Sequence, residues 1–314
     1  MNFIADAEVR TLAHIIAAMP RHMKTLNPTF MAVLLRTGMA LSLLGFASIA
    51  QAAPKKVLVV TTTLGFRHSS IATAEKIIAK LGEDSGAFSV DYARVEPNDP
   101  KFKGPDGKPD KTKVDEAIKA VLAEKMSLQA LKNYDAVIFA NTTGDLPLPD
   151  PDGFLDWIKS GKGFVGMHAA GDTFHHFPAY IDMVGAEFKH HDAQVEVDPI
   201  NEDKGCPACS HLPDKWKIFD EIYQFKNFDR AKVHGLLRLD HHPNDNTPGD
   251  YPLSWCKEYG QGRVFYTALG HREDVWDPDW KDRKNSKEVA EEYQKHILNG
   301  IKWAVGLEKW NAKP

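Results

Sequence analysis

The stretch that decides the fold is GKGFVGMHAAGD, residues 161–172. Within it, residues 163–167 form a short apolar run of the kind that makes a buried strand. A sharp turn follows, and α/β enzymes present a nucleophile, usually Ser or Cys, at such a strand-end turn. Here the residue at the tip is His168, and its small neighbours suit a strained turn. The stretch therefore predicts a buried strand with a histidine at its carboxyl end.

Strand and helix patterns alternate on the amino-terminal side of this stretch. Residues 56–62 are a continuous β-branched run, typical of a strand buried on both faces and hence of a parallel sheet. Residues 71–81 have helical apolar spacing, with Ser69 or Ser70 as a cap. The alternation predicts a doubly wound α/β sheet, which binds ligands at the carboxyl ends of its strands. The other elements expected here are strands at 88–95 and 135–141, helices at 114–122 and 151–160, and an exposed insertion at 96–113.

The pattern changes after residue 190 to shorter runs with strand-like alternation. These runs predict antiparallel strands that extend the same sheet, followed by a closing helix at 288–305. The expected fold is thus one α/β domain over 55–308 with a short tail at 309–314. The runs lie at 193–199, 221–228, 235–240, 252–259 and 263–271.

Residues 1–52 have the features of an N-terminal extension and a signal peptide. A basic segment begins at Met23, a plausible initiator, and leads into an apolar run and a small-residue cleavage pattern that ends at Ala52. An uncleaved membrane anchor is the alternative, but the apolar run is shorter than the ~20 residues that span a bilayer. We therefore expect a periplasmic or secreted protein without stable membrane insertion once the signal is removed.

The net charge argues against a nucleic-acid partner. The chain has a formal charge of −4, and residues 1–52 contain more basic than acidic residues, so the exported chain is more negative still. Binding to nucleic acid requires a basic surface.

Two of the three cysteines form a CPAC motif, Cys206 and Cys209, which His211 follows. In an exported protein the first interpretation of this spacing is a local disulfide. A metal clip that includes His211 and a pair of free thiols are the alternatives.

The histidines lie where a strand-end site needs them. His68 follows the first strand and His271 ends the run RVFYTALGH. His190 and His191 are adjacent and face opposite ways in an extended chain, so only one can join the site, and we choose His191. The acidic candidates are Asp172 beyond the elbow and Asp220 and Glu221 in FDEIYQF. The sequence predicts one cleft that joins His68, His168, Asp172, His191, Glu221 and His271.

Ordered motifs in this chain resemble the ThuA-like (trehalose-utilisation) family. They are KVLVVTTTLGFRHSSI (56–71), GKGFVGMHAAGDTF (161–174), MVGAEFKHH (183–191), FDEIYQF (219–225) and YGQGRVFYTALGHREDVW (259–276). The resemblance covers roughly residues 55–307. It implies a fold like that of class I glutamine amidotransferases, a flavodoxin-like three-layer sandwich with a mainly parallel sheet and an antiparallel extension. It also implies a role in using disaccharides or glycosides, including oxidised 3-keto-sugars.

The chain departs from the amidotransferases at the elbow. GMHAA replaces their cysteine-bearing turn, and no Cys lies near a strand-end motif, so a thiolate glutaminase is excluded. A histidine there can transfer protons or bind a ligand, although it cannot form a thioester. We expect catalytic roles for His168, Asp172, Glu221 and His271, and substrate-binding roles for Arg67, His68, Asn141 and His191.

Two other functions remain open at this stage. A non-catalytic carbohydrate-binding module would need exposed aromatic residues beside the cleft, for which Phe66, Phe174, Phe177 and Trp276 are the candidates. A metal-dependent hydrolase would use His68, His168, His191 and His271 as ligands of a divalent ion, although no HxH or HExxH pair is present. We expect no cofactor, with a divalent metal as the alternative. The expected partners are a small sugar or glycoside and an upstream sugar oxidoreductase that makes the ketone.

Overall fold

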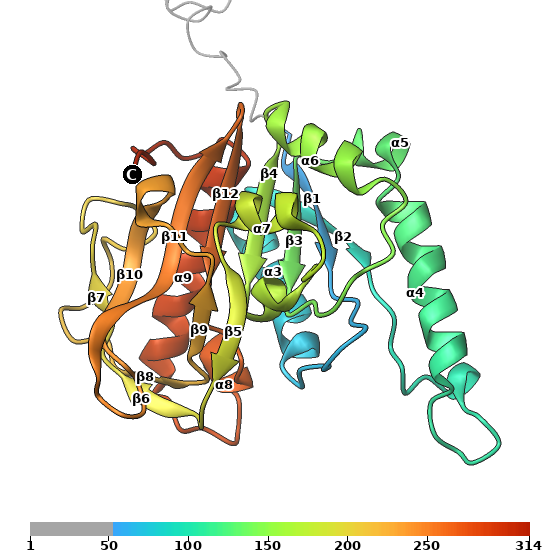
Figure 1. Ribbon diagram of the computed structural model, residues 1–314, viewed down its shortest axis with the longest axis horizontal. Helices are drawn as coiled ribbons and strands as arrows, with labels where there is room; N and C mark the ends of the chain where they lie inside the picture. The colour runs from blue at the N-terminus through green and yellow to red at the C-terminus, as the bar shows by residue number, and fades with distance from the viewer. Residues whose placement is uncertain (1–52) are drawn as a thin grey trace, which may run out of the picture. The chain divides into compact units, whose positions relative to one another are not determined.

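The computed structural model describes residues 53–314, so the signal peptide predicted within residues 1–52 lies outside the described part. Its main sheet has eight strands in the order β2-β1-β3-β4-β12-β11-β10-β7 (Figure 1). The first five run parallel and the rest pair antiparallel. The parallel strands are β1 (Lys55–Val60), β2 (Phe88–Ala93), β3 (Ala136–Ala140), β4 (Gly163–Met167) and β12 (Gly262–Thr267). The antiparallel strands are β11 (Pro248–Tyr259), β10 (His234–His241) and β7 (Ile200–Asn201).

Helices cover both faces of this sheet. Alternate residues of β1 belong to different cores, with Val57 and Val59 in one and Leu58 and Val60 in the other. The first core is covered by α3 (Ile71–Ser85), α8 (Glu273–Trp276) and α9 (Lys287–Ala304). The second is covered by α4 (Lys111–Lys125), α5 (Leu128–Leu131), α6 (Pro151–Lys159) and α7 (Pro178–Val184). Strands with both faces buried have continuous apolar sequences, as β1 does. The three-layer, flavodoxin-like sandwich predicted from the sequence is confirmed.

The antiparallel extension differs from its prediction in two respects. The strand β12 lies parallel to β4 and only then turns the sheet antiparallel. The runs at 193–199 and 221–228 leave the main sheet altogether, because β6 (Val195–Val197) pairs with β8 (Ile218–Asp220), and β9 (Tyr223–Lys226) pairs with β5 (Glu187–His191). Alternation predicts that a segment is extended, but it does not specify the partner strand.

The predicted Cys206–Cys209 disulfide is wrong, because all cysteines among residues 53–314 are free and buried. The amide of Cys209 donates to the carbonyl of Cys206, and both side chains pack in the first core with Ala208. The metal-clip alternative is not supported, because Cys206, Cys209 and His211 do not form a group of converging metal-ligand atoms among the described residues. The two thiols therefore act as small apolar side chains.

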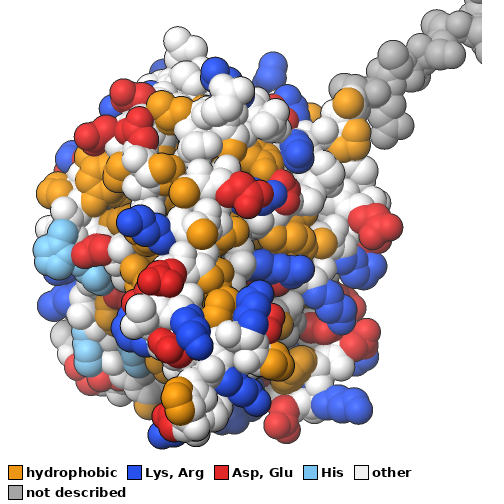
Figure 2. Space-filling view, turned by 90° about the vertical axis from the view of Figure 1, so that its right-hand side faces the viewer, with side chains coloured by type: hydrophobic (Ala, Val, Ile, Leu, Met, Phe, Trp, Pro, Cys, Tyr) orange, Lys and Arg blue, Asp and Glu red, His pale blue; other side chains and the backbone are white. Residues whose placement is uncertain are grey.

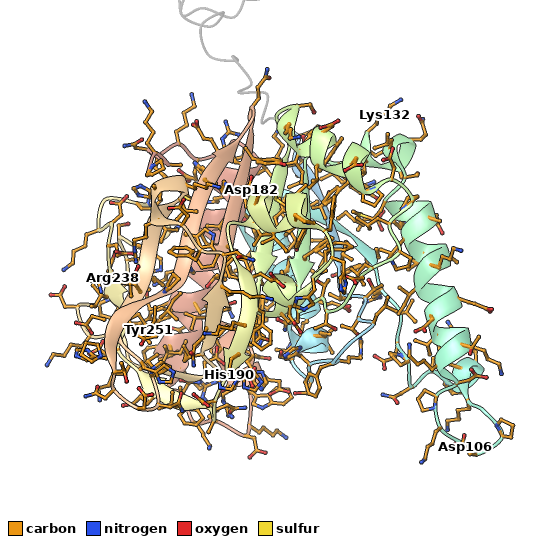
Figure 3. The ribbon with its side chains drawn as sticks, viewed as in Figure 1. Asp106, Lys132, Asp182, His190, Arg238 and Tyr251 are labelled. Carbon is orange, nitrogen blue, oxygen red and sulfur yellow. The ribbon has the colours of Figure 1, made fainter. Side chains whose placement is uncertain are left out.

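The segment at 96–113 is exposed as predicted, and Asp106 lies at the tip of its projecting loop (Figure 3). It contains a short 3₁₀ turn at Pro100–Phe102, whose Phe102 side chain packs into the second core. The side of the molecule that carries α4 shows acidic and basic side chains interspersed (Figure 2). None of the helices formed by residues 53–314 has the length and apolar content that a bilayer crossing requires.

Candidate active site

The strands β1, β3, β4 and β12 run in the same direction, so their carboxyl ends meet at one edge of the sheet. His68 lies in the loop after β1, and Asn141 and His168 directly follow β3 and β4. His271 lies four residues beyond β12. The order of the strands thus brings together side chains as distant in the sequence as His68 and His271, which are 203 positions apart.

His168 occupies a left-handed backbone conformation, with φ of 46°, at the start of the 3₁₀ turn His168–Asp172. For a residue other than glycine this conformation costs roughly 1–2 kcal/mol and persists only where the surroundings impose it. The hydroxyl of Tyr266 donates to the carbonyl of His168. A Cβ at Gly166 or Gly171 would come within 2.7 Å of the Tyr266 side chain, so these glycines allow the tyrosine to support the elbow.

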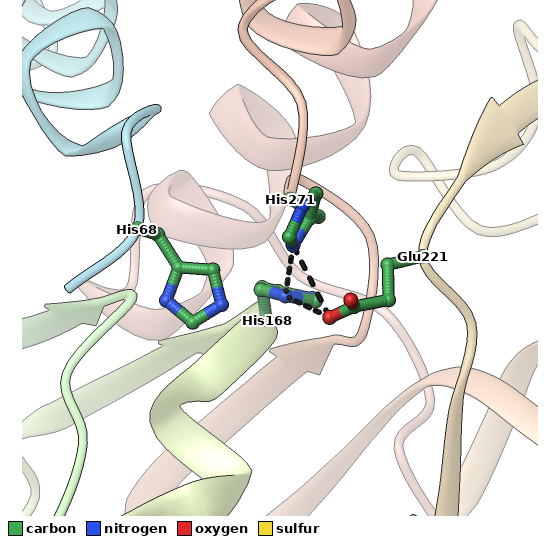
Figure 4. Close-up of side chains that lie close together, drawn as sticks. All are labelled: His68, His168, Glu221 and His271. Carbon is green, nitrogen blue, oxygen red and sulfur yellow. Dashed lines mark hydrogen bonds and ion pairs between the residues drawn. The ribbon is translucent and has the colours of Figure 1, made fainter. Parts of the chain in front are cut away.

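The backbone determines which nitrogen of His168 faces the site. Its Nδ1 lies 2.8 Å from the carbonyl oxygen of Ala268, which can only accept a hydrogen bond. Nδ1 therefore carries the hydrogen, and Nε2 is left as the proton acceptor. Nε2 lies 3.3 Å from Nδ1 of His271 and 3.5 Å from Oε1 of Glu221 (Figure 4).

Glu221 joins the histidines of the site. Its Oε1 lies 3.2 Å from Nδ1 of His271, and its Oε2 lies 3.1 Å from Nδ1 of His191. Burial by itself would raise the pKa of Glu221, but its contacts with the imidazoles of His168 and His271 outweigh burial and hold the pKa below its ordinary value. The carboxylate is thus charged at neutral pH and can stabilise positive charge on a neighbouring imidazole.

His271 has the raised pKa of the group. Burial by itself would lower its pKa, but the hydrogen bond and the charge of Glu221 raise it above its ordinary value. The arrangement therefore places a proton acceptor, Nε2 of His168, beside an imidazole whose pKa is raised and a carboxylate. Such a pair of groups can remove a proton from one atom of a substrate and deliver a proton to another.

Asp220 positions the loop that carries His271. Its two carboxylate oxygens accept hydrogen bonds from the amides of Gly270, at 2.7 Å, and Arg272, at 3.2 Å, the residues on either side of His271. Ser70 directly precedes α3, but its hydroxyl donates to the carbonyl of Gly270 and makes no capping hydrogen bond to the helix. The sequence pointed to Asp220 in FDEIYQF without giving it a role, and the structure gives it this positioning contact.

His68 completes a compact group with His168, Glu221 and His271. Its ring centre lies 4.9 Å from that of His168 and 5.2 Å from that of His271. Burial, and the charges of these two histidines, lower its pKa to about 2, and its Nδ1 is buried without a partner among the described residues. One ligand atom from each of the four residues lies within 4.8 Å of the others. Neutral imidazoles and a carboxylate are ligands of divalent transition metals, so this histidine cluster fits a metal ion as well as a proton-transfer group.

Two buried histidines make the stability of the metal-free protein depend on pH. The folded-state pKa is about 2 for His68 and about 4 for His296, both lowered by burial from 6.5. Below pH 6.5 the unfolded chain takes up protons that the folded chain does not. The free energy of unfolding should therefore fall by up to ~1.4 kcal/mol per pH unit for each histidine as the pH drops toward 4.

Urea unfolding between pH 7 and pH 4.5 in the presence of EDTA measures this slope. His271 and His175 have raised pKa values, so below pH 6 they are protonated in both states and add no slope. His68→Asn should remove about half of the slope. An equal slope in this variant and in the wild type would contradict the assigned neutral state of His68.

The remaining candidates lie around the cluster. His191 contacts Glu221 and is half exposed. His190 lies near the end of β5 (Figure 3), where it pairs with Asp192 and not with a residue of the cluster. Asp172 binds Nε2 of His175 at 2.8 Å, and burial raises its pKa. Asp172 therefore makes its hydrogen bond outside the cluster.

Arg67 and Asn141, for which substrate-binding roles are expected, both make contacts within the protein. Nη2 of Arg67 lies 3.0 Å from Glu96, and the side chain lines a cavity of about 650 Å³ that contains no residue of the histidine cluster. The amide nitrogen of Asn141 donates to Ser70 Oγ at 2.9 Å and so ties two strand-end loops together. Arg67 thus points away from the cluster, whereas Asn141 stays near it, since its side-chain nitrogen also lies 3.4 Å from the carbonyl oxygen of Gly270, the residue before His271.

Tyr223 is a neighbour of the cluster that was not among the residues predicted from the sequence. Its ring centre lies 4.2 Å from that of His168, and its ring is almost fully buried. In an extended chain, residues two apart point to the same side. The prediction that Glu221 faces the site therefore also indicated that Tyr223 faces it.

Comparisons with known proteins agree with this fold. The family model ThuA, described as trehalose utilisation, matches residues 56–304. A ThuA-like protein from Parabacteroides merdae is 20% identical with a TM-score of 0.59, and the match covers 83% of this chain and 93% of that one. A ThuA-like protein from Bacteroides uniformis is 20% identical with a TM-score of 0.57, covering 84% and 97%. No curated protein sequence matches the chain.

Proposed function

The chain belongs to the ThuA (trehalose utilisation) family, and on this basis we propose that it is an exported enzyme that acts on a glycoside in carbohydrate utilisation. Family membership suggests the carbohydrate role. The signal-like pattern in residues 1–52 supports a periplasmic or secreted location. Mass spectrometry of the exported protein tests the location, and an intact N-terminus at Met1 would contradict it.

The observation that carries the catalytic proposal is the position of His168 Nε2 opposite Glu221 and His271. A 3-keto-glycoside is the substrate that such a group suits, because the ketone makes the neighbouring C–H acidic. His168 Nε2 takes that proton, the electron pair forms a C=C bond, and the glycosidic C–O bond breaks. His271 gives its proton to the departing oxygen, and Glu221 stabilises the charged imidazole. A sugar oxidoreductase acting earlier supplies the ketone.

The test is to incubate the mature protein with trehalose, other glucosides and their 3-keto forms, and to follow product release. Release of the leaving sugar from the keto forms, together with an unsaturated keto-sugar that contains the new C=C bond, supports elimination, and release from the parent glycosides supports hydrolysis. Binding across the panel without turnover, by a normally folded protein, would favour the carbohydrate-binding module instead.

A metal-dependent hydrolase is the second candidate, and the four ligand atoms of the histidine cluster within 4.8 Å favour it. The donor set fits a divalent ion, and the Nδ1–H of His168 binds a carbonyl as the second nitrogen of metal-bound histidines does. His68, His168, Glu221 and His271 would be the ligands, with Glu221 in place of the His191 expected from the sequence. The ion would supply an activated water at neutral pH. Loss of activity in EDTA, together with a stoichiometric metal by elemental analysis, would select this candidate over proton transfer by His168.

A further inference from the structure

Phe66 exposes an aromatic ring beside the histidine cluster. Its exposed fraction is 67%, the highest of the large hydrophobic side chains among the described residues. Its ring centre lies 4.9 Å from that of His68, with the two planes at 81°. A single exposed apolar residue is ordinary on a protein surface. Phe66 differs because it adjoins the cluster.

The backbone around Phe66 is fixed although its ring is exposed. The amides of Leu64 and Gly65 donate to the carbonyl and to Oγ1 of Thr143, at 3.0 and 3.2 Å. Oγ1 of Thr143 in turn donates to the carbonyl of Phe66 at 3.0 Å. A Cβ at Gly65 would lie 3.2 Å from that Oγ1, so glycine lets the loop lie close against Thr143. The backbone that carries the exposed ring is therefore held in place before any ligand arrives, which limits the entropic cost of binding.

The other aromatic candidates for sugar contact do not offer an open ring. Phe174 and Trp276 are buried, with 4% and 0% exposure, and Phe177 is half buried. Tyr223 touches His168 but is also buried. Among the aromatic residues in ring contact with a histidine of the cluster, Phe66 is the one with a face free for a ligand.

We propose that Phe66 is the platform on which a pyranose ring of the glycoside packs while the histidine cluster acts on it. A pyranose has an apolar face of C–H groups and a rim of hydroxyls, and it can therefore contact an aromatic ring and polar groups at the same time. Here the aromatic ring adjoins His68, which in turn adjoins His168, so a sugar packed on Phe66 lies beside the cluster. This inference rests on the proposed function and adds the sugar-binding surface of the same site.

The experiment compares Phe66→Ala and Phe66→Tyr in the mature protein. Leu307→Ala serves as the matched control, because Leu307 is also exposed but follows α9, whose last residue, Ala304, adjoins Gly163 at the opposite end of β4. Phe66→Ala should raise KM for the best sugar of the panel, or its Kd by calorimetry, about tenfold, with a smaller change in kcat. Phe66→Tyr keeps the ring and should stay within about threefold of the wild type. Leu307→Ala should match the wild type.

The outcomes separate this proposal from the proposed function. If Phe66→Ala binds the sugar as tightly as the wild type, while His168→Ala no longer turns it over, the platform is wrong and the function stands. If the wild type neither binds nor converts any sugar of the panel, the function fails and the platform fails with it. Equal urea midpoints for the Phe66 variants and the wild type ensure that a change in KM reports on binding.

Discussion

His168→Ala is expected to lose on the order of 10²-fold or more in turnover while the protein remains folded, since this is the usual scale of general acid–base catalysis. The substitution removes Nε2, the acceptor that faces Glu221 and His271. It also leaves the Ala268 carbonyl without its partner. His168→Asn is the better-matched variant, because Asn tolerates the left-handed backbone at this position and still carries an N–H donor.

His176→Ala is the control for this experiment. His176 lies eight residues further along the chain, its side chain is 88% exposed, and it pairs with Asp145 outside the cluster. Its activity should equal that of the wild type. Retention of activity by both His168 variants would show that the elbow presents a structural histidine, and the catalytic proposal would have to be abandoned.

The sequence predicts the parallel half of the fold well because strands buried on both faces have continuous apolar runs. The strand β4 has the bounds expected from its apolar run, and α3 begins at the expected residue and ends later, at a left-handed Gly86. Once the strands are parallel, their carboxyl ends must share an edge. This is why His68, His168 and His271, distant in the sequence, could be expected to lie together.

The short strands after residue 190 have no comparable sequence pattern. Their alternation fits a half-buried strand in any sheet, and β6 and β9 find partners outside the main one. The disulfide prediction for the CPAC motif was wrong for a related reason. Two free thiols buried in an apolar core and two cysteines in a disulfide have the same sequence.

The sequence also did not predict the direction in which the loop side chains point. Arg67 and His68 are neighbours, yet Arg67 pairs with Glu96 and His68 joins the cluster. Asp172 shares the turn with His168 but binds His175. Spacing places such residues within reach of an edge, whereas the dihedral angles of a few loop residues decide which of them face the site.

Glu221→Gln should be nearly as damaging as the loss of His168, with turnover reduced on the order of 10²-fold or more. The carboxylate is the partner that raises the pKa of His271 against the effect of burial. Without its charge, burial dominates and the pKa of His271 should fall below 6.5, so that the proton donor is lost at neutral pH. Proton NMR of the imidazole resonances against pH, in EDTA, measures this shift.

The ion pair also sets the pH range in which Glu221 stabilises the fold. The folded pKa of His271 is raised above 6.5, so its contribution is complete below that pH and is lost as the pH rises through the folded pKa. The folded pKa of Glu221 is lowered below 4.5, so its contribution is complete above that pH and is lost on further acidification. Glu221→Gln should therefore cost most stability between about pH 4.5 and 6.5. A stability loss that is independent of pH, with an unchanged His271 titration, would mean that Glu221 acts through packing and not through its charge.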